Sequence, residues 1–510
     1  MIFLSLNDKP GDDYWSMALL KDIIKDLPDT DRELVVVPGE YQDAKAINDY
    51  IQKYNKVLFV LAADEENRFD LDLIKHKDII IYSMYPTDKY KNVDFWLPLG
   101  YTPHTRPILR DLGRQPRINT WFFSGQVTHD SRFKLVEQLK TLNGGILNET
   151  AGFTQGYPKE KYIEMMSLTK VIPSPGGAVP ESFRFYEALE AGAIPVAEDY
   201  DHHAKILTDL PPIFFDGWDD IKSHIVNRAQ NFTSFSNLTF AWWQMQKRQI
   251  RERFKKDLGI KDDITVIIPT SPVISNPDIK YIEEAVKSAR YQLPDAEIII
   301  TFDGIREEQK DINDKYQEYI ARVLWLCNFQ WENVTPIVFE EHTHQVGMAR
   351  KALEYVNTPY IVYVEHDAPF NDKPIDWDGA KRVLASGQLD MIRFHFEATI
   401  PKPHDHMMLD KEPIMIEDFP VIRTAQWSQR PHIATKTFYE RILKDHFSPQ
   451  AKSMIEDKMH GVAWNAYDTR GKAGWNDYKL GIYAPEGSFV RNYHTDAREG
   501  ADKYDKSQVF

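Results

Sequence analysis

Two carboxylates stand where the sequence predicts the end of a buried strand. The apolar run Tyr360–Val364 is followed at once by Glu365 and, two residues later, by Asp367. Carboxylates with this spacing just past a strand can meet one hard divalent cation, one directly and the other through water or substrate. Mg²⁺ or Mn²⁺ held there would bridge a nucleotide diphosphate and neutralise a leaving group. The pattern is common by itself, and a solvated turn is the alternative.

A third carboxylate stands at the end of another predicted strand. Asp303 follows the apolar run Glu297–Phe302, and a further run, Ile264–Ile268, leads into Pro269 and Thr270. Ligands of open α/β sheets bind at the carboxyl ends of the strands. We therefore expect these residues to meet at one edge of a sheet.

The order and spacing of these elements resemble the family 2-type inverting glycosyltransferases of the GT-A fold. The resemblance covers about residues 264–370. It rests on the motifs Ile267-Ile268-Pro269-Thr270, Asp303-Gly304, Gly347…Ala349-Arg350 and Glu365-His366-Asp367.

The resemblance implies a nucleotide-sugar donor and a Mn²⁺ or Mg²⁺ cofactor. By analogy, the base of the nucleotide lies beside Pro269 and Thr270. Asp303 is expected to bind the nucleoside, and Arg350 is expected to lie near the diphosphate. Asp367 is expected to bind the metal.

The resemblance also implies a metal shell that is completed late in the chain. Glu365 stands where the family has its first Asp, and we assign it to the donor and the metal together with Asp367. A late histidine often completes the shell, and His494 is the candidate, with a plain surface histidine as the alternative. His404 and His406 have metal-like spacing too, but an acceptor loop is the favoured interpretation for them.

A Glu-Asp pair on a predicted helix offers a general base. By analogy, one acidic residue of Glu456-Asp457 takes the proton of the acceptor hydroxyl while the sugar is attacked from the opposite face. We favour Asp457, with Glu456 second; a solvated helix face is the alternative, and the search would then turn to Glu397 and Asp405. His432 is a candidate for lining the acceptor pocket.

The N-terminal half of the chain has a Gly-rich junction between a strand and a helix at Ile172–Val196. Such a junction directs backbone N–H groups and a positive helix end toward a diphosphate. Ser182 is a candidate cap, and Arg184 in the first turn can add a bidentate charge. Glu187, one turn further, can accept two ribose hydroxyls. A helix N-terminus with an Arg–Glu surface pair is the alternative.

This junction resembles that of the exostosin-like glycosyltransferases of the GT-B fold, over roughly residues 90–200. The matching residues are Pro175, Gly176, Arg184, Glu187, Ala188, Gly192, Ile194, Pro195 and Val196, preceded by Phe123-Ser124-Gly125 and Arg132. The resemblance implies that the nucleotide diphosphate of a second sugar donor is held, without metal, by Gly125, Arg132, Gly176, Arg184 and Glu187.

Strand-like and helix-like runs alternate through most of the chain, which predicts parallel βαβ units. The expected fold class is α/β, with two Rossmann-like halves that form a GT-B unit, followed by a GT-A domain. We place the acceptor-side half at residues 1–110, the donor-binding half at 111–258 and the GT-A domain at 259–510. The boundaries lie near 105–118 and 257–263.

Composition sets limits on the class of protein. The chain has 510 residues, of which 42% are hydrophobic, and this excludes a wholly disordered protein. A single cysteine, Cys327 in an apolar run, is expected to be buried and excludes a Cys-based zinc site. No run approaches the roughly 18 apolar residues of a membrane span, and the N-terminus lacks the basic region of a signal peptide. A cytoplasmic protein without a transmembrane segment is therefore expected.

A net charge of −15 argues against a long nucleic-acid partner. The basic run Lys247–Lys256 is a local exception, for which a solvated linker helix is favoured over contact with phosphate or a membrane. The expected function is a bifunctional inverting glycosyltransferase that acts on hydroxyls of a glycan or glycoconjugate. The alternatives are a single GT-A activity with the GT-B unit as a binding module, or a viral-type transferase that glycosylates a modified DNA base.

Overall fold

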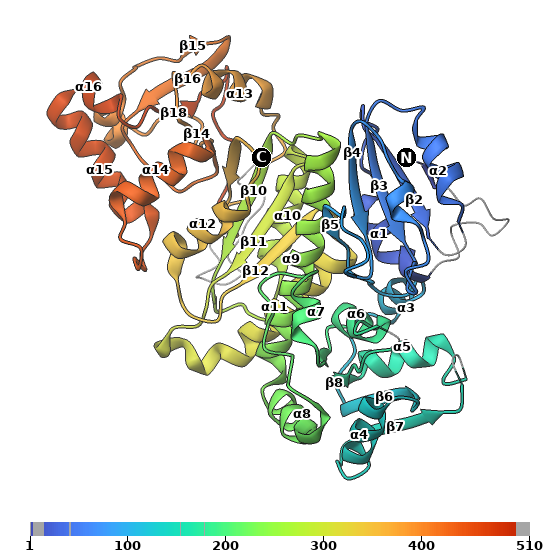
Figure 1. Ribbon diagram of the computed structural model, residues 1–510. Coiled ribbons are helices and arrows are strands. Elements are labelled where there is room, and N and C mark those ends of the chain that lie inside the picture. The colour runs from blue at the N-terminus through green and yellow to red at the C-terminus, as the bar shows by residue number, and fades with distance from the viewer. Residues whose placement is uncertain (1, 4–14, 40–41, 153–154, 178, 496–510) are drawn as a thin grey trace. The chain divides into compact units, whose positions relative to one another are not determined.

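The computed structural model describes residues 2–3, 15–39, 42–152, 155–177 and 179–495. The chain divides into two compact units, Met1–Lys261 and Asp262–Phe510, called here the N-terminal and C-terminal units. Both are α/β with parallel strands, so the expected fold class is confirmed at that level (Figure 1). The finer division of the N-terminal unit at residue 110 stays a prediction.

The N-terminal unit holds two separate sheets whose described strands all pair in parallel. The first has the order β1-β2-β3-β4-β5, with β1 Ile2–Phe3, β2 Glu33–Pro38, β3 Val57–Ala62, β4 Ile79–Ser83 and β5 Phe95–Trp96. The second has the order β7-β6-β8-β9, with β6 Asn119–Gln126, β7 Gly145–Thr150, β8 Thr169–Pro173 and β9 Ile194–Val196. Strands β2 and β3 are almost continuously buried, as expected for parallel strands covered on both faces.

The helices of this unit are short, with one exception. They are α1 Ala18–Ile24, α2 Ala44–Ile51, α3 Thr105–Leu112, α4 Asp130–Leu139, α5 Lys159–Ser167, α6 Phe183–Glu190, α7 Tyr200–His203, α8 Ile221–Gln230 and α9 Phe232–Leu258, with 3-10 turns at η2 Trp15–Met17, η3 Leu71–Leu73 and η4 Trp218–Asp220. The exception is α9, which runs for 27 residues and ends at Gly259. Gly259 has a φ of 80°, the left-handed conformation that commonly closes a helix.

One hydrophobic core joins the two sheets of the N-terminal unit. It contains Val36 and Val60 from the first sheet, Ile194 from the second, and Trp243 and Phe254 from α9. Because both sheets pack into the same core, they form one compact unit rather than two.

A buried polar joint reinforces this core. The Glu190 carboxylate, at the end of α6, is fully buried. It accepts hydrogen bonds from Arg106 of α3 and from Trp243 and Lys247 of α9. The Arg106 Nη1 atom lies 2.9 Å from the carboxylate. The buried negative charge of Glu190 is therefore paired with positive side chains, and removing a partner would leave it uncompensated.

The basic run on α9 is not the solvated helix face that the sequence suggested. Lys247 pairs with Glu190, Arg251 donates to the carbonyl of Lys25, and Arg253 pairs with Asp257 at 2.7 Å. The helix itself is present, but these charges act within the unit because α9 crosses its core.

The C-terminal unit is built on one sheet of nine strands. Its order is β12-β11-β10-β13-β17-β14-β18-β16-β15, and the strands are β10 Ile264–Thr270, β11 Glu297–Phe302, β12 Val334–Val338, β13 Tyr360–Tyr363, β14 Met391–Arg393, β15 Ile414–Ile416, β16 Phe419–Thr424, β17 His432–Thr435 and β18 Leu480–Tyr483. Strands β12, β11, β10 and β13 pair in parallel. Beyond β13 the pairing is antiparallel except for β14 with β18.

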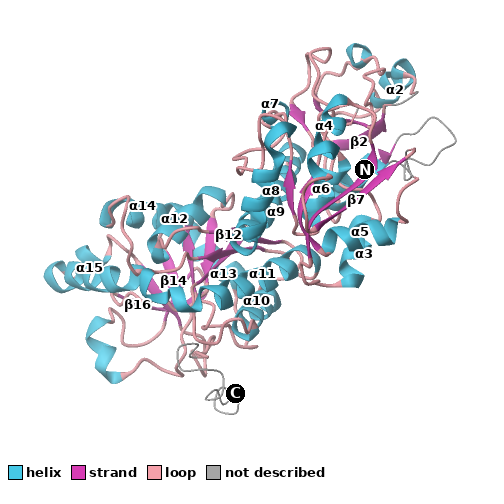
Figure 2. Cartoon of the chain, turned by 90° about the horizontal axis from the view of Figure 1, so that it is seen from below, coloured by secondary structure: helices cyan, strands magenta, loops and turns pink. Residues whose placement is uncertain are grey.

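Helices cover this sheet on both faces. They are α10 Lys280–Gln292, α11 Asn313–Phe329, α12 His344–Tyr355, α13 Trp377–Ala385, α14 Lys436–His446, α15 Ile455–Arg470 and α16 Lys472–Trp475, with 3-10 turns at η5 Glu307–Ile312 and η6 Lys402–Met407. Figure 2 shows α12 and α14 on one side of the sheet and α10 and α11 on the other. Cys327 lies buried in α11, as predicted.

In the part of the chain that the structure describes, no helix combines the length and apolar character needed to cross a bilayer.

Candidate active site

The parallel strands of the C-terminal unit end at a common edge that gathers the predicted donor residues. The backbone N–H of Asp303, just after β11, donates to the carbonyl of Thr270 at the end of β10 over 3.0 Å. Pro269 lies opposite Thr301 within the sheet. The Thr270 hydroxyl shares a 3.0 Å hydrogen bond with the hydroxyl of Tyr319. The two strand ends are thus locked together at this edge.

The Asp303 carboxylate organises the loop before α12. It is only 3% exposed, and it accepts hydrogen bonds from the N–H groups of Thr343 at 2.7 Å and His344 at 3.1 Å. The Nδ1 atom of His342 lies 2.8 Å from Oδ2 of Asp303, the oxygen that also accepts from His344. Asp303 therefore shapes the loop 342–344, and its contact with a nucleoside stays a prediction.

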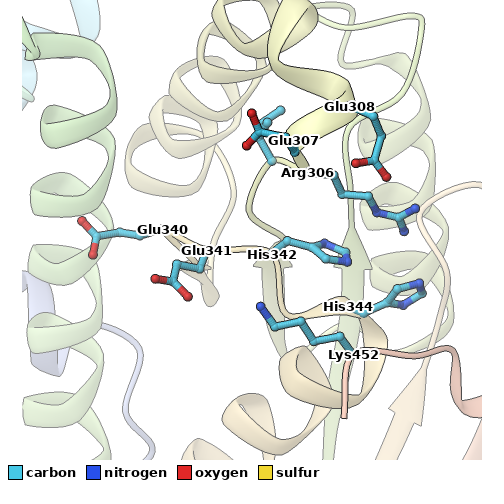
Figure 3. A pocket seen from close by; sticks show the side chains of 9 residues that line it. Arg306, Glu307, Glu308, Glu340, Glu341, His342, His344 and Lys452 are labelled. Carbon is cyan, nitrogen blue, oxygen red and sulfur yellow. The ribbon is translucent and has the colours of Figure 1, made fainter. Parts of the chain in front are cut away.

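A cavity of about 710 Å³ opens beside this loop (Figure 3). Its lining combines four acidic side chains with cations and histidines: Ile305, Arg306, Glu307, Glu308, Glu340, Glu341, His342, His344 and Lys452. Because His342 and His344 contact Asp303, the cavity adjoins the predicted nucleoside position. Sequence reasoning missed this lining. The signal available was the dense charge soon after the predicted strand at 297–302 and after the apolar run that forms β12.

Arg350, expected near the diphosphate, points elsewhere in the structure. It lies on α12, and its guanidinium donates to the carbonyls of Leu443 and Phe447 at 2.8 Å and of Ser448 at 2.7 Å. These carbonyls follow the last turn of α14, where a cation is favoured. A role at the diphosphate would require Arg350 to leave these bonds.

Asp367 and His494 come together although they lie far apart in the sequence. The Nε2 atom of His494 lies 3.4 Å from a carboxylate oxygen of Asp367. Burial opposes ionisation of Asp367, but the hydrogen bond from His494 and the charges of His366 and His494 hold its pKa well below the usual range. Asp367 therefore offers an ionised oxygen donor with a nitrogen donor beside it.

The hydrogen-bond partner and the pKa of Glu365 differ from those of Asp367. Its carboxylate accepts a 2.8 Å hydrogen bond from the side-chain amide of Gln345. Burial, followed by the negative charges of Asp367 and Glu456, raises the pKa of Glu365 to about 8. A cation at this edge would relieve that repulsion.

The metal prediction can be tested against these donors. Among the described residues, no group of three or more His, Cys, Asp or Glu side chains is arranged to hold a metal ion. Asp367 and His494 nevertheless supply one oxygen and one nitrogen donor, a set that suits Mn²⁺. Asp367 and His494 fit two positions of such a site, and the metal contact expected of Glu365 stays a prediction.

Both members of the predicted base pair lie in the first turn of α15. Glu456 accepts a 3.1 Å hydrogen bond from the backbone N–H of Gln429, and its charge reaches Glu365. Asp457 is exposed, and its charge reaches His344 in the loop that Asp303 organises. Glu456 thus lies near Glu365 after β13, whereas Asp457 is open to solvent.

The other histidines do not form a second metal site within the described residues. His404 lies 3.4 Å from the side chain of Gln426, and the ring of His406 meets Trp464 edge-on. His432 is completely buried between the rings of Tyr363 and Tyr439. The prediction that it lines an acceptor pocket is wrong because strand β17 turns its ring into the core.

In the N-terminal unit, two arginines meet at the carboxyl end of β6. Arg184 Nη2 donates to the carbonyl of Ser124 at 2.6 Å, and its guanidinium lies 4.6 Å from the ring of Phe123. At Gly125, a Cβ atom would lie 2.7 Å from Arg184 Nη2, so a side chain there would push against the arginine.

Arg132 lies close enough to Arg184 for their charges to repel. Its Nη2 atom donates to the carbonyl of Gly176 at 2.9 Å, which ties α4 to the loop before α6. Burial, followed by the charge of Arg184, lowers the pKa of Arg132 to about 10. Two cations in this position favour an anion between them.

Two expectations at the start of α6 need correction. The Ser182 side chain makes no capping hydrogen bond. Glu187 is not part of a surface pair, because it is 3% exposed and accepts a 2.6 Å hydrogen bond from the hydroxyl of Thr102. Burial raises its pKa. Its expected contact with ribose stays a prediction, which would have to compete with Thr102 and Thr105.

No protein-family model and no curated protein matches the chain. Among solved structures, the chain is similar to S. aureus TarS 1–349, with 15% identity over 46% of this chain and 60% of that chain and a TM-score of 0.29. The same fragment in complex with UDP-GlcNAc gives 15% identity over 46% and 58%, with a TM-score of 0.28. A mannosyltransferase from Pyrobaculum calidifontis, in complex with GDP-Man and Mn²⁺, gives 13% identity over 45% and 59%, with a TM-score of 0.26. The chain covers less than two thirds of each, and scores this low do not define its fold.

Proposed function

We propose that the C-terminal unit is a glycosyltransferase that moves a sugar from a nucleoside-diphosphate donor to a hydroxyl of a glycan or glycoconjugate. The observation that carries this proposal is the convergence of charge at one sheet edge. Asp303 follows β11, Asp367 pairs with His494 after β13, and Glu456 reaches the same edge from α15. In open α/β sheets this edge is where ligands bind.

Each residue then has one task in an inverting transfer. Asp303 and the loop it organises face the nucleoside. Asp367 and His494 would hold a divalent cation, which neutralises charge on the leaving diphosphate when it is bound. Asp457 takes the proton of the acceptor hydroxyl as that oxygen attacks the anomeric carbon from the face opposite the nucleotide. Glu456 is the alternative base, since it lies near enough to Glu365 for its negative charge to raise the pKa of that residue.

For the N-terminal unit we propose a second nucleotide-sugar site, which would make the protein bifunctional. Arg132 and Arg184 support it, because two partly buried cations lie together at the end of a strand. A binding module without catalysis is the second candidate, favoured by the engagement of Glu187 with Thr102. Transfer to a modified DNA base has less support, since the basic residues of α9 pair within the unit and the net charge is −15.

The test is a panel of nucleotide sugars incubated with the full-length protein, with and without Mn²⁺, in which release of the nucleoside diphosphate is recorded. A glycosyltransferase releases the diphosphate of one donor, or of two donors if both units act. Release of none of them, with a range of glycan acceptors present, would contradict the proposal.

A further inference from the structure

Several buried polar atoms near the carboxyl end of β14 have no hydrogen-bond partner among the described residues. They are Nε of Arg393, both ring nitrogens of His395, Oε2 of Glu397, Nη1 of Arg430 and Oδ1 of Asn492. The backbone of Thr399 lies near the His395 ring without forming a well-aligned hydrogen bond. Buried polar atoms in proteins are almost always paired with protein, water or ligand. We call these five residues the polar cluster.

The side chains of the polar cluster are held in place by their other atoms and by the chain around them. Arg393 is 4% exposed, and its Nη2 atom donates to the side chain of Gln426 at 3.0 Å. Asn492 is fully buried, and its Nδ2 atom donates to the carbonyl of Phe394 at 2.6 Å. The backbone carbonyl of His395 accepts from the N–H of Arg491 at 2.7 Å. The side chains of Arg393 and Asn492 are therefore fixed while one polar atom of each stays unpaired.

Several members of the polar cluster lie close to one another and to one of the two base candidates, Glu456. His395 Nε2 lies 3.6 Å from Glu397 Oε2, just beyond hydrogen-bonding distance. Burial lowers the pKa of Arg393 to about 10, and the positive charge of Arg430 lowers it further. The negative charges of Glu456 and Glu397 act in the opposite direction. The cluster therefore lies within electrostatic reach of α15, where the acceptor hydroxyl would lose its proton.

The chemistry of the unpaired atoms points to hydroxyl groups. Arg393 and Arg430 offer N–H donors, Glu397 and Asn492 offer acceptor oxygens, and His395 has one ring nitrogen of each kind when neutral. A hydroxyl both donates and accepts, so a ring that carries several hydroxyls can satisfy such a mixed set.

The balance of charge in the polar cluster and an exposed ring beside it limit the class of ligand that can bind. The two arginines are balanced by Glu397 and Glu456, which leaves no excess positive charge for an anion. At the rim, Phe396 is 41% exposed, and the Arg430 guanidinium lies 4.4 Å from its ring. An exposed aromatic ring beside polar groups provides an apolar surface for the C–H face of a sugar.

We propose that the polar cluster is the acceptor subsite of the C-terminal unit and that it takes a neutral, hydroxyl-rich ring such as a hexopyranose. A uronic acid or a phosphate-bearing acceptor would add a charge that the cluster does not balance. The assignment as acceptor subsite rests on the proposed function of this unit.

Saturation-transfer NMR on the full-length protein tests the subsite without turnover. The probes are methyl glycosides of glucose, galactose, mannose and N-acetylglucosamine, with glucuronic acid as the charged comparison. At least one neutral glycoside should receive saturation transfer, more strongly than glucuronic acid. Glu397→Gln and His395→Asn should reduce it roughly fivefold, the scale of one lost hydrogen bond. Glu412→Gln, at an exposed position of the same unit, is the matched control and should leave it unchanged.

Three outcomes would overturn the proposal. The first is no transfer to any neutral glycoside, as expected if ordered water alone pairs these atoms. The second is stronger transfer to glucuronic acid than to every neutral probe. The third is equal transfer in the wild type and in Glu397→Gln, the variant that best preserves the fold because its carboxylate is partly exposed.

The nucleotide-sugar panel separates this inference from the proposed function. If the wild type releases a nucleoside diphosphate but no glycoside binds, the subsite is wrong and the glycosyltransferase stands. If glycosides bind through Glu397 and no donor is turned over, the sugar site stands and the proposed function fails.

Discussion

The Nε2 atom of His494 lies 3.4 Å from the Asp367 carboxylate, and the backbone beside it holds the two segments together. The N–H of Thr495 donates to the carbonyl of Asp367 at 2.8 Å, and the N–H of Tyr493 donates to that of Pro369 at 3.2 Å. The loop after β13 is thus fixed by the segment 491–495.

The first prediction is that donor turnover by the C-terminal unit requires a divalent cation and Asp367. Asp367→Ala removes the ionised oxygen ligand, so diphosphate release should fall at least roughly 10²-fold, since metal charge stabilisation contributes several kcal/mol. Asp372→Ala, at an exposed position nearby, is the control and should keep normal rates. Full activity in excess EDTA would show that the pair has a structural role instead.

The second prediction separates the general base from the metal ligands. Asp457→Asn keeps size and shape but cannot take a proton, so transfer should fall by roughly 10²–10⁴ while nucleotide binding persists. Glu456→Gln should cost less if Asp457 is the base. Asp468→Asn, exposed on the same helix, is the matched control. The reverse ranking would assign the role to Glu456, and normal rates in both variants would exclude the pair.

The third prediction concerns the N-terminal unit. Arg184→Ala removes one of two adjacent cations, and nucleoside-diphosphate binding should weaken by about 1.5–3 kcal/mol, the scale of a charge-assisted hydrogen bond. Calorimetry should use the full chain carrying Asp367→Ala, in EDTA, so that nucleotide binding at the C-terminal site contributes little to the measured heat. Arg110→Ala, at an exposed position of α3, is the control. Undetectable nucleotide binding before the Arg184 change would favour the binding module.

The fourth prediction is a loss of stability in mild acid caused by His432. Burial is the main cause of its low folded-state pKa of about 4, and the charge of Arg393 adds to it. An unfolded histidine titrates near 6.5, so below that pH the unfolded chain binds more protons and stability falls as pH falls toward 4. At pH 5 the loss is about 2 kcal/mol relative to pH 8.

Urea unfolding of the C-terminal unit at pH 8 and pH 5 measures this loss. His432→Gln should unfold more easily at pH 8, because it loses stacking with Tyr363 and Tyr439, but it should show a smaller difference between the two pH values. An unchanged pH difference in the variant would mean that other groups are responsible.

The fifth prediction is that Cys327 does not react in the folded protein. Burial raises the pKa of its thiol, and only the thiolate is a good nucleophile. Modification by iodoacetamide at pH 8 should therefore be negligible without denaturant and complete in urea, as measured by mass spectrometry. Rapid labelling of the native protein would contradict the burial of α11.

The strands were predictable because their runs of apolar residues are long and uninterrupted. The three runs at 264–268, 297–302 and 360–364 correspond to β10, β11 and β13 within two residues. The five strands beyond β13 were not predicted, since short antiparallel strands such as Met391–Arg393 carry little pattern of their own.

The spacing of residues along the sequence could not predict the direction in which their side chains point. Arg350 and Glu187 stand at motif positions, yet each is engaged by groups remote in sequence, Leu443 and Thr102. The polar cluster was equally hidden, because Asn492 reaches the carbonyl of Phe394 only after β14 and the segment at 491–495 have folded together.

The docking of residues 491–495 on residues 367–371 has a consequence for biosynthesis. A ribosome releases Asp367 long before it releases His494, so a nascent chain cannot pair the two until nearly the whole C-terminal unit has been synthesised. The strands β10 to β13 can assemble earlier, since their pairing is complete without the later segment. A chain interrupted shortly before residue 491 would then carry a well-formed parallel sheet whose edge at Asp367 lacks its later partner, and under the proposed function such incomplete translation products would not turn over a donor.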